Sequence, residues 1–112
     1  MDSILDSIKK LIGLEADYDA FDAGIIVFIN GAFSTLQQMG IGPPTPYRIQ
    51  DDTNVWSEWS DDFFVIEESK NYVYLQVRKT FDPPTSSYVM DALEKQISEL
   101  GWRLYTYCQK EY

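Results

Sequence analysis

Apolar residues recur at three- and four-residue intervals in four segments of the chain, which is the spacing of one face of an α-helix. The first segment runs from about Asp2 to Ile12 and is followed by Gly13, a residue type that often ends helices. The second runs from about Asp19 to Met39, with Asp17 and Asp19 as candidate caps, and is apolar over most of its circumference. Because such a helix is usually buried, we expect the second segment to be central.

The third segment predicts a helix less clearly than the fourth segment does. The third, from about Phe63 to Phe81, is rich in β-branched and aromatic residues, so 72–77 is also compatible with a strand. The fourth, from about Thr85 to Gln109, has one clear stripe, and Glu99 and Arg103 have the spacing of a helical ion pair. The stripe consists of Val89, Leu93, Ile97, Leu100 and Leu104. Together the segments predict an all-α fold, a small bundle of about four helices, in a single domain over 1–112.

A long segment without helical periodicity separates the second and third predicted helices. Its first part, residues 40–46, contains two glycines and three prolines, which exclude a regular helix. Tyr47–Ile49 and Val55–Trp56 could pair as a very short β-hairpin. Trp56 and Trp59 lie on one side of a helical turn, so at least one of them is expected to close the core. Loops of this length in a small domain are usually functional or tied to a partner.

Composition narrows the chemistry that the chain can perform. It has no histidine, which excludes catalysis by histidine and zinc binding by histidine. Its one cysteine, Cys108, cannot form an internal disulfide or a CxxC metal site. Eighteen acidic and nine basic residues give a net charge of −9, which disfavours binding to phosphates of nucleic acids. Residues 1–62 carry eleven acids and only three bases, whereas the second half is almost neutral.

Targeting and membrane signals are weak in this sequence. The first residues lack the basic and then apolar pattern of a signal peptide. The longest apolar run, from Ala23 to Phe33, is interrupted by Asn30 and is shorter than the roughly 20 residues that span a bilayer. We therefore expect a soluble protein with no membrane partner.

Two acidic pairs come closest to a metal or acid–base site. Asp51-Asp52 lacks the alternating ligands and the central glycine of an EF-hand loop, so a solvated turn is the simpler interpretation. Asp61-Asp62 has the position of a capping pair before the third helix. We predict no catalytic residue, no metal ligand and no cofactor.

Aromatic residues gather toward the end of the chain, at Trp102, Tyr105, Tyr107 and Tyr112. Two interpretations are open. Trp102 and Tyr105 could pack on the bundle while the last residues fray, or an exposed aromatic tail could dock into another chain, since Tyr and Trp are enriched at interface hot spots.

The segment Phe81-Asp82-Pro83-Pro84-Thr85-Ser86-Ser87 predicts a rigid corner between the last two helices. Pro83 forces Asp82 out of the helical region and ends the third helix. Asp82, Thr85 or a following serine can cap the fourth helix, and a proline is compatible with its first turn.

The order and local sequences of these elements resemble the head–tail connector (adaptor) proteins of tailed phages with long non-contractile tails. The matching residues are Tyr47-Arg48-Ile49, Trp56-Ser57-Glu58-Trp59, Tyr72-Val73-Tyr74-Leu75-Gln76-Val77-Arg78, the corner 81–87, and the closing helix with Leu93-Glu94-Lys95-Gln96-Ile97 and Leu100-Gly101-Trp102-Arg103-Leu104. The likeness extends over nearly the whole chain. Its most specific parts are the corner and the following Trp-Arg-Leu.

The resemblance implies a structural protein of the virion neck, at the capsid–tail junction, that is made in the host bacterial cytoplasm and is not an enzyme. Such proteins form a ring, usually a dodecamer, under the portal protein. They extend the DNA channel and present a surface to the next stopper or tail-completion protein. DNA would pass through this channel without specific binding.

Residue roles follow from the same resemblance, because family members commonly use a terminal segment and inter-helix loops to grip the portal and neighbouring subunits. The residues expected at portal or subunit contacts are Trp102, Tyr105, Tyr107, Tyr112, Phe81, Asp82, Pro83 and Pro84. The acids expected to face the channel are Asp51, Asp52, Asp61 and Asp62. A wall around moving DNA should repel phosphate, which makes acidic residues suitable there.

A second hypothesis is a soluble acidic phage-encoded regulator or DNA-mimic inhibitor. Mimicry requires acids spaced like phosphates over one surface, and the nearly neutral second half of the chain argues against this arrangement. The size of the protein in solution, alone and with a portal protein, distinguishes the two hypotheses.

Overall fold

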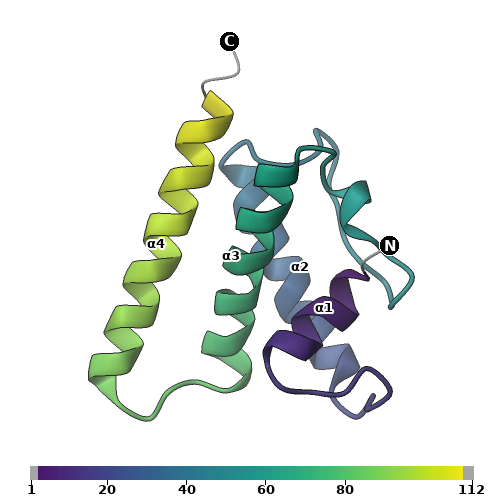
Figure 1. Ribbon diagram of the computed structural model, residues 1–112, viewed down its shortest axis with the longest axis vertical. Coiled ribbons are helices and arrows are strands. Elements are labelled where there is room, and N and C mark those ends of the chain that lie inside the picture. Colours follow the sequence, from purple (N-terminus) through teal and green to yellow (C-terminus); the bar gives the residue numbers. More distant parts are fainter. Residues whose placement is uncertain (1–2, 110–112) are drawn as a thin grey trace.

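The computed structural model describes residues 3–109 and shows an all-α bundle, which confirms the predicted fold class. Its helices are α1 (Ile4–Leu11), α2 (Asp22–Gln38), α3 (Phe63–Phe81) and α4 (Ser87–Gln109), with a short 3-10 helix, η1 (Trp56–Glu58), in the long loop (Figure 1). α3 lies in the middle and packs against each of the other three helices. α4 stands at one edge and packs mainly against α3 (Figure 1).

The prediction that α2 is the central helix is wrong. It packs on α3 and α1 and buries one face in the core, but its opposite face is exposed to solvent. The exposed residues are Ala23, Gly24, Val27, Gly31, Ser34, Thr35 and Gln38. Alanine and glycine count as apolar in a sequence pattern, yet they bury little surface. They therefore widen the apparent apolar stripe without requiring a partner inside the bundle.

α2 also begins later than its pattern predicts, at Asp22 rather than Asp19. Phe21 occupies the cap position, and no side chain there accepts a hydrogen bond from the helix. The predicted caps, Asp17 and Asp19, lie in the exposed connection that precedes the helix. Asp22, the first residue of α2, is in contact with α1.

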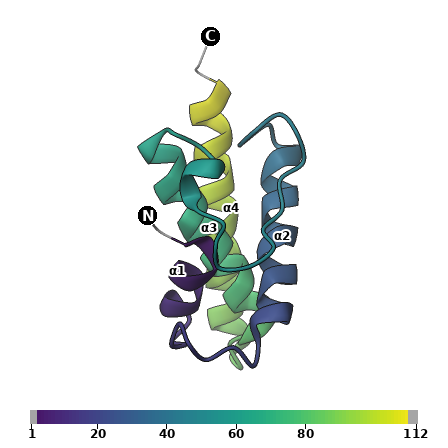
Figure 2. The same cartoon turned by 90° about the vertical axis from the view of Figure 1, so that its right-hand side faces the viewer.

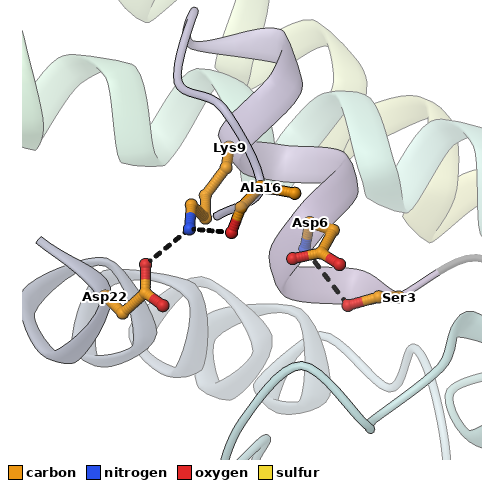
Figure 3. A network of polar contacts seen from close by, with 5 residues as sticks. All are labelled: Ser3, Asp6, Lys9, Ala16 and Asp22. Atoms are coloured by element: carbon orange, nitrogen blue, oxygen red, sulfur yellow. Dashed lines mark hydrogen bonds and ion pairs between the residues drawn. The ribbon is translucent and has the colours of Figure 1, made fainter. Parts of the chain in front are cut away.

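That contact is made by Lys9 of α1, whose side chain is fully buried (Figure 3). Its Nζ lies 2.8 Å from Oδ1 of Asp22 and donates to the carbonyl oxygen of Ala16 at 2.9 Å. Burying an ammonium group costs several kcal/mol unless partners compensate, so both contacts are needed. The same view shows the cap of α1, where Ser3 Oγ accepts the amide N–H of Asp6 at 3.1 Å.

α3 is helical throughout 72–77, so the strand alternative for this segment is wrong. Tyr72, Val73 and Val77 are buried there. Because helices cover α3 on several sides, its β-branched and aromatic side chains fill the core, and this packing outweighs their preference for strands.

α4 begins at Ser87 rather than Thr85, and most of its predicted stripe is buried. The buried members are Leu93, Ile97, Leu100 and Leu104, whereas Val89 is about half exposed. Arg103 does not use Glu99 as its partner: its Nη1 lies 2.7 Å from Oε1 of Glu68 on α3. This ion pair links the two helices.

The long loop between α2 and α3 does not contain the short hairpin. Val55 forms an isolated antiparallel bridge with Ser3 instead, and the Ile4 amide donates to the Asn54 carbonyl at 2.9 Å. Ile49 is held by the buried side chain of Asn30 on α2. The Asn30 Oδ1 accepts the Ile49 amide at 2.8 Å, and its Nδ2 donates to the Ile49 carbonyl at 3.1 Å. A side-chain amide thus takes the place of a strand partner.

Further anchors hold the rest of this loop against the bundle. The Gln37 side chain donates to the carbonyls of Pro43 and Thr45 at 3.0 and 2.8 Å, and accepts the Tyr47 amide at 3.0 Å. Trp56 and Trp59 are both buried, which confirms and extends the prediction for this pair. Their indole N–H groups donate to Ser7 Oγ and Ser69 Oγ, each at 2.9 Å.

Two ends of the bundle can be distinguished (Figure 1). At the upper end lie the C-termini of α2 and α4, the N-terminus of α3 and the adjoining parts of the long loop. At the lower end lie the α1–α2 connection and the corner between α3 and α4. α2 and α4 run in the same direction, and Figure 2 shows α1 and α2 on opposite sides of the narrow dimension of the molecule.

Candidate functional site: two aromatic surfaces

The first candidate surface lies on the upper half of α4. Trp102 is 68% exposed and Tyr105 is 40% exposed, and their rings stack with centroids 6.1 Å apart. A groove beside them is lined by Met39, Ile97 and Gly101, among others. We call Trp102, Tyr105 and this groove the upper aromatic surface. Of the two interpretations of this segment, exposure of Trp102 and Tyr105 agrees with docking into another chain.

Tyr107 is different, because it faces α3. Its hydroxyl donates to Oδ2 of Asp62 at 2.8 Å, and its ring lies 4.4 Å from that of Phe64. Oδ1 of Asp62 caps α3 by accepting the amide N–H groups of Phe64 at 2.9 Å and Val65 at 3.3 Å. The Tyr107 hydroxyl and these amides hold the pKa of Asp62 below its usual range. Tyr107 therefore secures the last turns of α4 to the start of α3.

We expect Tyr107→Phe to lower the free energy of unfolding by about 1 kcal/mol at pH 7, because the hydrogen bond to Asp62 is lost. A depressed carboxyl pKa stabilises the fold above the unfolded pKa of about 3.9 and loses this effect as pH falls through the folded value. The difference in the free energy of unfolding between wild type and variant should therefore become smaller below about pH 4. Urea titrations between pH 3 and pH 7 measure this, and a difference that grows with acid would contradict it.

The second candidate surface lies at the lower end. Phe81, which is partly buried, meets Phe21 edge to face at 5.2 Å, and Phe21 meets Tyr18 in the same way at 5.8 Å. Tyr18 and Phe21 are each about half exposed. We call Tyr18, Phe21 and Phe81 the lower aromatic surface. The residues Asp82 and Pro83 of the adjoining corner are exposed, and Pro84 is partly buried.

The structure thus divides the predicted contact residues between the two ends. Phe81, Asp82, Pro83 and Pro84 lie at the lower end, whereas Trp102, Tyr105 and Tyr107 lie on the upper half of α4 (Figure 1). Tyr112 lies outside the described residues. Tyr18 and Phe21 are not among the predicted contact residues, because the apolar pattern placed Phe21 inside the predicted helix from Asp19 to Met39 and Tyr18 stands just before it. The only signal was the position of two aromatic residues among the acids of 17–22.

The predicted channel acids do not form one cluster. Asp51 and Asp52 are exposed in the turn of the long loop, where Asp51 accepts the Thr53 amide at 2.9 Å. The Thr53 hydroxyl, with this amide, lowers the pKa of Asp51. Asp61 is exposed before α3, and the carboxylate of Asp62 is engaged as described above. Within residues 3–109, no group of three or more His, Cys, Asp or Glu side chains could hold a metal ion.

Comparison with known families identifies the family of the chain. The family model described as "Phage connector protein" matches residues 4–111. The chain belongs to the phage connector protein family. No curated protein and no solved structure matches it.

Phage connectors form a structural family of the virion whose members assemble with other virion proteins. The match includes both aromatic surfaces and the loop between α2 and α3. It confirms the resemblance seen in the sequence. In the part of this connector that the structure describes, no helix is long and apolar enough to cross a membrane.

Proposed function

We propose that this connector forms a ring, a dodecamer as is usual for the proteins it resembles, under the portal protein of a phage capsid. The ring extends the DNA channel and joins the capsid to a stopper or tail-completion protein at the neck. The observation that carries the proposal is the presence of exposed aromatic surfaces at both ends of one bundle.

The position of these surfaces suits a protein with two different neighbours along the virion axis. The bundle measures 43 Å along its longest dimension, and the upper and lower aromatic surfaces are separated along it (Figure 1). Tyrosine and tryptophan supply large contact areas and often carry most of the affinity of an interface. One surface would contact the portal protein, and the other would contact the next component of the neck.

The fold also supplies rigid support for both surfaces. The upper one stands on α4, which is tied to α3 by the Arg103–Glu68 ion pair and by Tyr107 on Asp62. The lower one rests on the α1–α2 connection, which Lys9 holds through Ala16 and Asp22. Little ordering is needed on binding, which preserves affinity.

Acidic residues fit the passage of DNA through the ring. Asp51, Asp52 and Asp61 have exposed carboxylates that would repel phosphate from a channel wall. Asp62 is a poorer candidate, because Tyr107 and the start of α3 occupy both of its oxygens. A map of the assembled ring that placed the three exposed acids at subunit contacts or on the outside would contradict this part of the proposal.

We expect the double substitution Trp102→Ala and Tyr105→Ala to weaken binding to one of the two neighbours by roughly 30-fold or more, since a hot-spot residue contributes about 2 kcal/mol or more. The fold should be retained, because Trp102 is largely exposed and neither side chain belongs to the buried core. Titration calorimetry against the portal protein and the stopper protein of the same phage measures this. Tyr18→Ala with Phe21→Ala is the matched variant and should affect the other neighbour.

Unchanged affinity of both double variants for both partners would contradict the proposed surfaces. A chain that never binds a portal protein, but competes with DNA for a nuclease or a repressor, would support the acidic regulator instead.

A further inference from the structure

We infer that the outer face of α4 in one copy packs against the outer face of α2 in the next copy of the ring. This inference depends on the self-assembly in the proposed function and adds which two helices meet. It differs from the end surfaces, because it concerns the sides of the bundle.

The outer face of α4 carries exposed side chains in one stripe below the upper aromatic surface. Its exposed residues at alternating three- and four-residue steps there are Tyr88, Asp91, Lys95 and Ser98. Tyr88 is 78% exposed. This spacing aligns the side chains along one face of the helix, and α3 occupies only the opposite face of α4. The one acid and one base on this stripe balance each other.

The outer face of α2 has small residues at the same spacing and no charge. The positions are Gly24, Val27, Gly31, Ser34 and Gln38, and all are exposed. No charged residue occurs anywhere from 23 to 47. Two copies with a net charge of −9 each repel one another, so a contact between copies is favoured where neither face adds net charge. A second copy therefore suits this uncharged face better than a basic partner does.

Gly24 and Gly31 have no explanation inside one copy. Glycine within a helix is less stable than alanine, so an interior glycine needs a reason. The other glycines have one: Gly13, Gly40 and Gly42 have positive φ, and a Cβ on Gly101 would lie 3.3 Å from the Tyr72 ring. A Cβ on Gly24 or Gly31 would meet no atom within 4 Å. Close approach of an outside helix with bulky side chains supplies the missing reason, because packed helices place large residues against small ones.

The directions of the two helices agree with this contact. α2 and α4 run in the same direction, and they stand at different edges of the bundle, α4 in Figure 1 and α2 in Figure 2. Rotation about an axis along the helices preserves direction and height. Each α4 would therefore lie parallel to the neighbour's α2, and a head-to-tail contact of this kind closes into a ring when the rotation between copies divides a full turn evenly.

Disulfide trapping tests the pairing. In a Cys108→Ser background, Ser98→Cys and Gly31→Cys place one thiol near the middle of each helix, on its outer face. We expect mild oxidation of an equal mixture of the two single variants to give at least tenfold more covalent dimer than either variant alone. A chain carrying both substitutions should give a ladder of covalent oligomers. The control mixture contains Ser98→Cys and Asn71→Cys, because Asn71 is an exposed residue of α3.

Sedimentation velocity, with and without portal protein, is run in parallel to measure whether the chain assembles. Assembly without cross-links above the control would overturn the helix pairing and leave the ring intact. Dimers of Ser98→Cys alone would indicate a symmetric α4–α4 contact and would also overturn it. A chain that remains monomeric even with portal protein would overturn the ring itself.

Discussion

Asp22→Ala is expected to lower the free energy of unfolding by about 3 kcal/mol, because it removes the carboxylate from a fully buried ammonium group. Lys9 would keep only the Ala16 carbonyl as partner. Water cannot easily replace the lost oxygen at a buried site, so most of the desolvation cost of the ammonium would be left uncompensated. Loss of this pair should also release the connection that carries Tyr18 and Phe21, and with it the lower aromatic surface.

Urea unfolding, followed by the fluorescence of the buried tryptophans, measures this effect. Asp19→Ala removes a neighbouring exposed carboxylate and should change stability by less than about 0.5 kcal/mol. Adding Lys9→Met to Asp22→Ala should recover much of the loss, because an apolar side chain then fills the site of the ammonium. Equal stabilities of the Asp22→Ala and Asp19→Ala variants would show that the pair does not support the fold.

Asn30→Leu is expected to cost about 3 kcal/mol, because it removes both hydrogen bonds that hold Ile49 in the core. Leucine has the same branching as asparagine, with two methyl groups in place of the amide oxygen and nitrogen, but neither donates nor accepts. The buried amide and carbonyl of Ile49 would then lack partners, which is more costly than the loss of a hydrogen bond at the surface. The middle of the long loop should detach, while the four helices remain.

Hydrogen exchange of the Ile49 amide gives a local measurement of this detachment, and it should become at least tenfold faster in the variant. Asn71→Leu, at an exposed position of α3, is the matched control and should leave both stability and exchange nearly unchanged. If the Ile49 amide exchanged as slowly in Asn30→Leu as in wild type, the other anchors of the loop would be enough to hold Ile49 in place.

Local signals explain why the four helices could be predicted. The bounds of α3 agree with the pattern, because Asp62 caps one end and Pro83 prevents continuation at the other. The start of α2 was misplaced, because three aspartates in 17–22 are equivalent as caps in sequence but only Asp22 meets a buried cation. Lys9 looked like an ordinary basic residue near the end of a helix, and nothing in its neighbours along the chain reveals its burial.

The candidate site was predictable only in part, for a related reason. Trp102 and Tyr105 could be recognised as an exposed aromatic pair or as core residues, and the pattern of α4 did not decide between them. Tyr107, two residues after Tyr105 and five after Trp102, is an internal anchor on Asp62. The lower aromatic surface joins Phe81 to Tyr18 and Phe21 across about sixty residues of chain, a distance over which periodicity carries no information.

The sequence by itself determined the helices, the proline corner, the buried tryptophans and the family, since each depends on residues close together in the chain or on their order. Only the tertiary structure decided that α3 rather than α2 is central, that Asn30 takes the place of a hairpin partner, and that the aromatic residues divide between two ends. These features depend on which faces meet. The apolar or polar character of a helix face indicates whether that face is buried or exposed. The direction in which each helix approaches the others is set by the packing of the whole core.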